Sequence, residues 1–194
     1  MPRSAPWFER IPVTEAKSQS ATVMSTTAMN IVSCLGSNVL LSTARVVVKT
    51  SNGNIIVVKA LLDSASQLSF ATSDLVRRIG ATTKSCQLPI VGISYSNASP
   101  VRSICSLELH SQSSNYALNV NCAVVNNITT HLPAQIIYAT CWNISKNIQL
   151  SDSKFYQPST IDFLLGADVY YDVVSSNVWR RKDYPSLIET RFGW

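Results

Sequence analysis

The sequence predicts an all-β fold, a barrel or sandwich with one or two short helices. Apolar runs rich in β-branched residues recur at short intervals along residues 39–125, with turn-forming residues between them, which is the pattern of short strands in such folds. One pair of runs is joined by an Asn-Gly turn, and one segment carries clear helix signals. At 194 residues the chain can bury one good core and gives no reason to expect two full domains.

The first 38 residues are predicted to form a flexible tail or linker. They are rich in Ser, Thr and Ala, lack a clear period, and contain Pro2, Pro6 and Pro12 without an obvious partner segment. We therefore expect the folded domain to comprise residues 39–194.

The domain is expected to open with a β-hairpin. Residues 39–41 lead into a strand at residues 44–49, and a second apolar run follows at residues 55–62. Asn52 and Gly53 lie between them, and both tolerate the positive φ that a tight primed turn demands.

A short strand and a helix follow. The strand is expected at residues 67–70, and residues 72–74 then offer Thr, Ser and Asp side chains as N-caps. The helix continues through residues 75–79, and Gly80 is its natural end. The chain therefore returns to strands only after one short helix.

The next strands are expected at residues 87–93, 101–110 and 116–125, with a polar turn between the last two. No period holds over residues 126–160, where polar stretches alternate with isolated apolar groups. We interpret residues 126–160 as a long insertion.

Residues 161–170 form the last clear pattern. An apolar strand breaks there at Gly166 and turns into a short helix, which Asp168 could cap. The C-terminus is rich in aromatic residues at 190–194 and predicts a strand that is cut within its length.

Composition narrows the class of protein. A hydrophobic fraction of 46% and a charged fraction of 14% describe a globular chain. The net charge of +5 is carried by scattered residues, apart from clusters at 77–78 and 180–182. We interpret these clusters as solvated faces, so nucleic acid is not an expected partner of this segment.

The five cysteines are odd in number and widely spaced, without the close pairs of a zinc knuckle or a redox motif. They predict free or buried thiols in a reducing, cytoplasmic compartment. No segment approaches about 20 apolar residues, so neither a signal peptide nor a membrane span is expected.

One acidic residue stands out for its chemistry. Asp63 ends an apolar run and is followed by Ser64, Ala65 and Ser66. A carboxylate at the end of a buried strand, facing a turn, can have its proton affinity set by a neighbouring carboxylate. The chain has one such loop, so the second carboxylate would come from a second molecule. The alternative is an ordinary turn, because Asp-Ser pairs also cap helices and form Asx turns.

Four segments, in this order, resemble the retroviral-type aspartic proteases, most closely the protease segment of Bel/Pao long-terminal-repeat retrotransposon polyproteins. They are Leu-Leu-Ser-Thr-Ala at 40–44, Ala-Leu-Leu-Asp-Ser-Ala-Ser-Gln at 60–67, Ile-Asp-Phe-Leu-Leu-Gly-Ala-Asp at 161–168 and Glu-Thr-Arg-Phe-Gly-Trp at 189–194.

The resemblance implies a closed acid-protease-like barrel that is half of a two-fold homodimer. Each subunit would contribute Asp63 to a catalytic pair, Ser64 would brace the two loops, and Gly166 would support the site. The implied substrate is a polypeptide, and the chemistry needs no metal and no cofactor.

The resemblance also implies a flap, a hairpin that closes over the substrate, with Gly92 and Ile93 near its tip. An ordinary surface hairpin is the alternative. The third loop residue is usually Gly in the family and here is Ala65. A negative φ would tolerate its methyl group, whereas a positive φ would cost about 1–3 kcal/mol.

Three alternatives stay open. Asp168 could pair with Asp63 within one chain, although its position favours a helix start. The domain could be a catalytically silent dimerisation or peptide-binding module. It could also be a Gag-like structural or nucleic-acid-binding segment.

Overall fold

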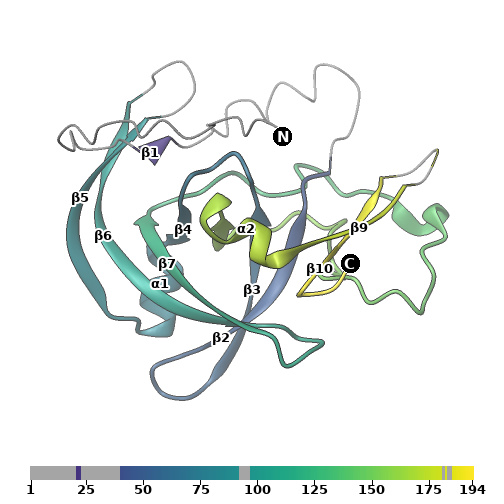
Figure 1. The fold of residues 1–194 in the computed structure, drawn as a ribbon, viewed down its shortest axis with the longest axis horizontal. Helices are drawn as coiled ribbons and strands as arrows, with labels where there is room; N and C mark the ends of the chain where they lie inside the picture. The colour runs from purple at the N-terminus through teal and green to yellow at the C-terminus, as the bar shows by residue number, and fades with distance from the viewer. Residues whose placement is uncertain (1–20, 23–39, 92–96, 181, 183–184) are drawn as a thin grey trace, which may run out of the picture.

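The computed structural model describes residues 21–22, 40–91, 97–180, 182 and 185–194, and it is mostly β with two short α-helices (Figure 1). The expected tail, residues 1–38, lies outside the described residues except for β1. The elements are β1 (Ala21–Thr22), β2 (Thr43–Lys49), β3 (Ile55–Leu62), β4 (Ser69–Thr72), α1 (Ser73–Ile79), β5 (Thr83–Val91), β6 (Asn97–His110), β7 (Ala117–Val125), the 3-10 helix η4 (Ala139–Trp142), β8 (Phe163–Leu165), α2 (Ala167–Val173), β9 (Val174–Trp179) and β10 (Leu187–Thr190).

Six strands close into a barrel. Their order is β6–β2–β3–β8–β4–β7, and β7 pairs back with β6. Strand β5 extends from β6 beyond the ring, and β1 pairs with β5. The all-β prediction is therefore confirmed, and of its two forms the structure is the barrel.

The hairpin of β2 and β3 matches the prediction except at its turn. Alternate residues of β2 point into the core, among them Val46 and Val48, as the period of two requires. The turn is longer than the expected tight form, because the Thr50 N–H donates to the Asn54 carbonyl at 2.8 Å. Only Gly53 takes a positive φ there, at 84°, so Asn52 does not form the predicted primed turn.

Helix α1 has the predicted caps. The Thr72 hydroxyl accepts the Leu75 N–H at 3.2 Å, and Gly80 ends the helix in the left-handed region, at φ 66°. Leu75 and Ile79 face the core. The short strand before it, β4, begins at Ser69, two residues later than predicted, because the preceding residues belong to the loop.

Strand β8 brings two distant parts of the chain together. It pairs in parallel with β3, with Leu62 opposite Leu165, and antiparallel with β4, with Phe70 opposite Leu164. The ends of β3 and β8 therefore lie side by side, and the loop after Asp63 meets the turn at Gly166.

The buried apolar side chains form two clusters. The larger fills the barrel and includes Val169 and Val173 of α2. The smaller joins Leu61 of β3 to Ile90 of β5 and Val101 of β6. The β5–β6 hairpin therefore covers one face of the sheet that carries β3.

The C-terminal region differs from the sequence expectation. Strands β9 and β10 form a separate two-stranded sheet that was not predicted. Strand β10 ends at Thr190, and a turn follows in which Gly193 has a φ of 122°. Trp194 then donates its N–H to the Gln149 carbonyl at 2.9 Å, so the last residues form a turn rather than a strand.

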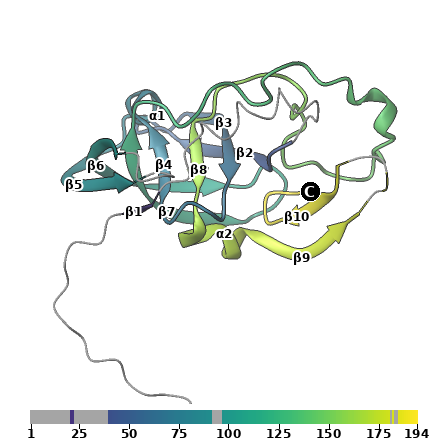
Figure 2. The ribbon, with the colours of Figure 1, turned by 90° about the horizontal axis from the view of Figure 1, so that it is seen from above.

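Residues 126–160 connect β7 to β8 and contain η4 and an isolated bridge between Leu132 and Ser159. Figures 1 and 2 show η4 and the β5–β6 hairpin at opposite ends of the molecule. Neither α-helix in the described part of the chain is long and apolar enough to cross a membrane.

Candidate active site

Asp63 begins the loop that follows β3, and backbone hydrogen bonds fix its position. Its N–H donates to the Leu165 carbonyl at 3.0 Å, and its carboxylate Oδ1 accepts the Ala65 N–H at 2.9 Å. Asp63 is half-buried, while Ser64 and Ala65 are exposed. The Asx turn considered from the sequence is therefore present, and it orients the carboxylate at the surface of the chain.

The backbone at Ala65 accommodates a side chain. Among the described residues other than glycine, Asn143 alone has a positive φ. Ala65 is therefore outside the left-handed region, and the strain considered for a positive φ does not arise. In the single chain its methyl group is exposed.

Gly166 marks the crossing of two chain segments. The Ala167 N–H donates to the Ser66 carbonyl at 2.7 Å, which ties the start of α2 to the Asp63 loop. A Cβ atom at Gly166 would lie 2.4 Å from the Leu68 carbonyl oxygen and 2.8 Å from that of Ser66. The φ of Gly166, −86°, is open to any residue, so backbone conformation does not require glycine here. The lack of space for a side chain does.

The far end of the loop is bound to the same crossing. The Ser69 hydroxyl donates to Asp168 Oδ1 at 2.7 Å and accepts the Gly166 N–H at 3.0 Å. The Ser69 N–H donates to Asp168 Oδ2 at 3.3 Å. The sequence predicted that Asp168 satisfies N–H groups of its own helix, but α2 has no side-chain cap. The carboxylate instead binds Ser69 at the end of the loop. This structural role explains Asp168 without pairing it with Asp63 in the same chain.

The face of β3 that leads to Asp63 lies under the β5–β6 hairpin. Leu61 packs in one cluster with Ile90 and Val101 of that hairpin. The loop that begins at Asp63 therefore leaves β3 two residues after this covered side chain. Gly92 and Ile93, the expected tip of the flap, lie outside the described residues.

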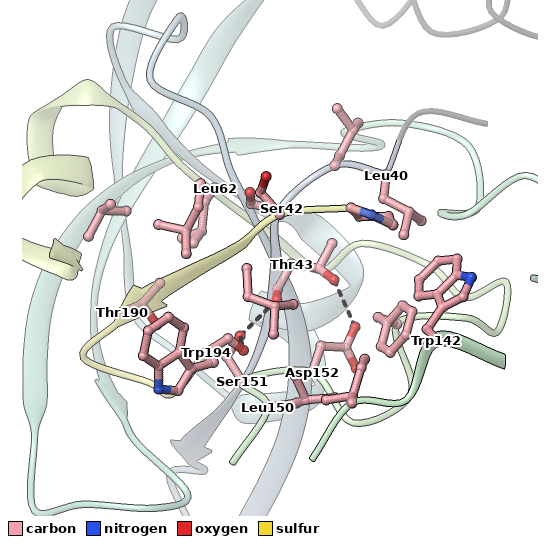
Figure 3. A pocket seen from close by; sticks show the side chains of 18 of the residues that line it. Leu40, Ser42, Thr43, Leu62, Trp142, Leu150, Ser151, Asp152, Thr190 and Trp194 are labelled. Carbon is pink, nitrogen blue, oxygen red and sulfur yellow. Dashed lines mark hydrogen bonds between the residues drawn. The ribbon is translucent and has the colours of Figure 1, made fainter. Parts of the chain in front are cut away.

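A cavity of about 120 Å³ lies beside the loop but is not lined by Asp63 (Figure 3). Leu62 forms part of its wall, and Leu40, Trp142 and Trp194 add further apolar surface. Leu62 belongs to the barrel core, on the face opposite Leu61. Leu41, which packs against the cluster that contains Leu61, and Thr43, which lies opposite Leu61 on β2, also line the cavity, so it adjoins the end of β3 without including Asp63 in its wall.

The polar groups around this cavity bind one another. The Thr43 hydroxyl donates to Asp152 Oδ2 at 2.8 Å, and the Ser151 hydroxyl donates to the Trp194 carbonyl at 2.9 Å. Lys59 Nζ lies 3.0 Å from Asp152 Oδ2 and also donates to the Leu132 carbonyl at 2.9 Å. Both side chains of this ion pair are buried, so the pair joins residues 126–160 to β3.

The sequence did not single out Lys59, Asp152, Ser66 or Ser69. One signal was available, because Lys59 interrupts an otherwise apolar run on β3 and a buried charge requires a partner. The serines gave no signal, since nothing distinguishes them among the many serines of this chain.

Two of the described cysteines are buried in the core and carry thiols that ionise poorly. Cys86, Cys105 and Cys122 are free, and burial raises the pKa of the Cys105 and Cys122 thiols. Within the residues that the structure describes, no group of His, Cys, Asp and Glu side chains could hold a metal ion.

Comparison of the chain with protein-family models, curated proteins and solved structures finds no match. Function is therefore inferred from the residues of the Asp63 loop and from the elements that position them.

Proposed function

We propose that this chain is one subunit of a retroviral-type aspartic endopeptidase that cleaves a polypeptide, the retrotransposon polyprotein of Bel/Pao type from which it derives. Two subunits would form the active enzyme, and each would contribute Asp63. Neither a metal nor an organic cofactor has a role in this chemistry.

The observation that carries the proposal is the crossing between the Asp63 loop and Gly166. It presents one half-buried carboxylate on a loop whose two ends are bound to the turn between β8 and α2. A rigid loop is what a shared carboxylate pair needs, because two acids must be held at a fixed separation.

The chemistry follows from the proximity of two carboxylates. At about 3 Å apart both cannot ionise easily, so one retains its proton and the pair titrates as a unit. The ionised Asp63 would act as general base on a water molecule that attacks the scissile carbonyl. The protonated Asp63 of the second subunit would donate to the carbonyl oxygen and stabilise the developing negative charge.

The surface formed by α2, β9 and β10 supports a dimer. Strands β9 and β10 pair with no third strand in the described part of the chain, and a two-stranded sheet alone is at best marginally stable in water. Tyr171 of α2 is 76% exposed, and Val178 of β9 is 38% exposed. A second copy packed here would cover apolar surface on α2 and β9, the two elements that follow Gly166.

The backbone at Ala65 supports activity over the catalytically silent module. That alternative depended on distortion of the loop by the Ala65 methyl group, and its φ is not positive. Ser64 is exposed and so is accessible to the partner loop, where its hydroxyl would brace the pair.

The test compares Asp63→Asn with Asp74→Asn, a matched change at a carboxylate on the exposed face of α1. Each protein is incubated with a proteome-derived peptide library, and cleavages are identified by mass spectrometry. We expect cleavage by the wild type and by Asp74→Asn, and loss of at least about 10³-fold in rate for Asp63→Asn, since the general base is removed.

Sedimentation shows whether the protein is a dimer, and a nucleic-acid binding assay at several salt concentrations tests the third alternative. Equal cleavage by Asp63→Asn would refute the assignment of the catalytic residue. A wild-type dimer that cuts no peptide would favour the silent binding module, and steeply salt-dependent binding to nucleic acid would favour the Gag-like segment.

A further inference from the structure

The cavity of about 120 Å³ lies where three parts of the chain meet (Figure 3). Leu62 of its wall comes from the end of β3, Leu150 and Phe155 come from residues 126–160, and Leu187 comes from β10. A molecule bound in the cavity would therefore contact the barrel, the connection between β7 and β8, and the C-terminal sheet at the same time.

Much of the wall is apolar, and several of its large side chains are only half-buried. Leu40, Leu150, Phe155, Leu187 and Trp194 belong to this group. Each of these side chains still exposes apolar surface to water. The hydrophobic effect therefore favours a ligand that covers this surface.

The buried polar groups of the wall already have protein partners. The Asp152 carboxylate accepts the Thr43 hydroxyl at 2.8 Å and lies 3.0 Å from Lys59 Nζ. The Ser151 hydroxyl donates to the Trp194 carbonyl at 2.9 Å. Among the described residues, no buried side-chain nitrogen or oxygen lacks a hydrogen-bond partner. A polar ligand would gain little from these groups, so the wall selects an apolar one.

The size of the cavity and its aromatic side chains narrow the ligand to a single ring. An engineered apolar cavity of about 150 Å³ in another protein binds benzene, and this cavity is of similar size. Trp142 and Phe155 stack in its wall, with ring centroids 5.6 Å apart and planes 20° from parallel. Trp194 lies on the other side of Thr43 and Asp152 (Figure 3). Aromatic rings pack favourably against such side chains.

We propose that this cavity is a binding site for small apolar aromatic molecules of one ring, and that such a ligand stabilises the junction of the barrel, residues 126–160 and the C-terminal sheet. The site does not depend on the proposed function, because Asp63 is not part of its wall. Its failure or success is therefore measured without any cleavage assay.

The test uses the full chain with benzene as the probe and pyridine as a polar molecule of the same shape. Saturation-transfer nuclear magnetic resonance measures binding, and scanning calorimetry measures Tm. We expect a Kd for benzene of about 1 mM, and a rise in Tm of about 3 °C at about 10 mM benzene. Pyridine should bind at least about tenfold more weakly, because its ring nitrogen would be buried without a donor.

Two pairs of variants locate the site. Ile144→Trp fills the cavity from residues 126–160, and Ile136→Trp is its matched control at a residue that is 62% exposed and outside the wall. Val174→Trp and Val178→Trp repeat the comparison on β9, where Val174 alone of the two lines the cavity. Each filling variant should bind benzene at least about tenfold more weakly, since the space for the ring is lost, and each control should bind as the wild type does.

Amide hydrogen exchange of the wild type locates the site even if a filling variant does not fold. The Ser151 N–H donates to the Trp194 carbonyl at 2.6 Å, and the Trp194 N–H donates to the Gln149 carbonyl at 2.9 Å. Benzene should slow exchange at both amides. Absence of benzene binding by the wild type, equal binding of pyridine, full binding by a folded filling variant, or unchanged exchange at these amides would overturn the proposal.

Discussion

The Asp63 loop and residues 126–160 are both irregular, but different interactions hold them in place. The loop is bound by short backbone hydrogen bonds to residues 165–167 and by the buried side chain of Ser69. Residues 126–160 are joined to β3 mainly through the buried ion pair of Lys59 and Asp152. The first arrangement depends on backbone and on one glycine, whereas the second depends on a charge that one substitution can leave unpaired.

The largest effect is expected at the glycine. Gly166→Ala places a methyl group 2.4 Å from the Leu68 carbonyl oxygen, so the crossing itself must move. We expect a loss of about 4 kcal/mol in the free energy of unfolding, above the usual range for overpacking because backbone and not side chains must yield. Urea denaturation followed by circular dichroism measures it.

Gly53→Ala is the matched control for that change. Gly53 has a positive φ of 84°, but a Cβ atom there meets nothing within 4 Å. Its expected cost is therefore about 1 kcal/mol, from backbone strain alone. Equal losses for the two variants would show that the crossing at Gly166 is not tightly packed.

The next effect concerns residues 126–160. Lys59→Met leaves the Asp152 carboxylate buried without its cation, and we expect a loss of about 3 kcal/mol, as is usual when one partner of a buried pair is removed. The double variant Lys59→Met/Asp152→Leu removes both charges and should recover most of this loss. Limited proteolysis should cut the single variant faster within residues 126–160. A double variant less stable than Lys59→Met would contradict the assignment.

The smallest effect is expected at Asp162, which lies between residues 126–160 and β8. Asp162 precedes β8, and burial raises the pKa of its carboxyl group although Arg78 opposes this shift. A raised folded pKa means that the contribution to stability is present below the unfolded pKa and is lost as the pH rises through the folded pKa.

The wild type should therefore gain stability relative to Asp162→Asn as the pH falls from 7 toward 4. Denaturation of both proteins at several pH values tests this. If Asp162→Asn instead gained stability relative to the wild type on acidification, the folded pKa of Asp162 would be lowered, and the effect of burial would be refuted.

The sequence predicted the elements whose signals are local. Thr72 has the side chain that begins a helix and Gly80 the backbone freedom that ends one, and the alternation of β2 follows from burial of one face. The same reasoning identified Asp63 at the end of β3 and a break at Gly166. It did not predict β9 and β10.

Contacts between distant segments were outside the reach of local patterns. The role of Asp168 depends on Ser69, which lies 99 residues away in the chain, so the sequence favoured the nearer N–H groups of α2. The partner of Lys59 likewise depends on how residues 126–160 return to β3. The pairing of β1 with β5 uses backbone groups, which carry no residue signature.

The most direct test of a carboxylate pair shared by two chains is the activity of mixed dimers. Wild type and Asp63→Asn are mixed in equal amounts and allowed to exchange subunits, and peptide cleavage is measured at constant total protein. If each site needs Asp63 from both chains, only wild-type pairs are active, and the rate falls to about a quarter of that of the wild type alone. A rate of about one half would show that each chain acts by itself and would contradict the shared site.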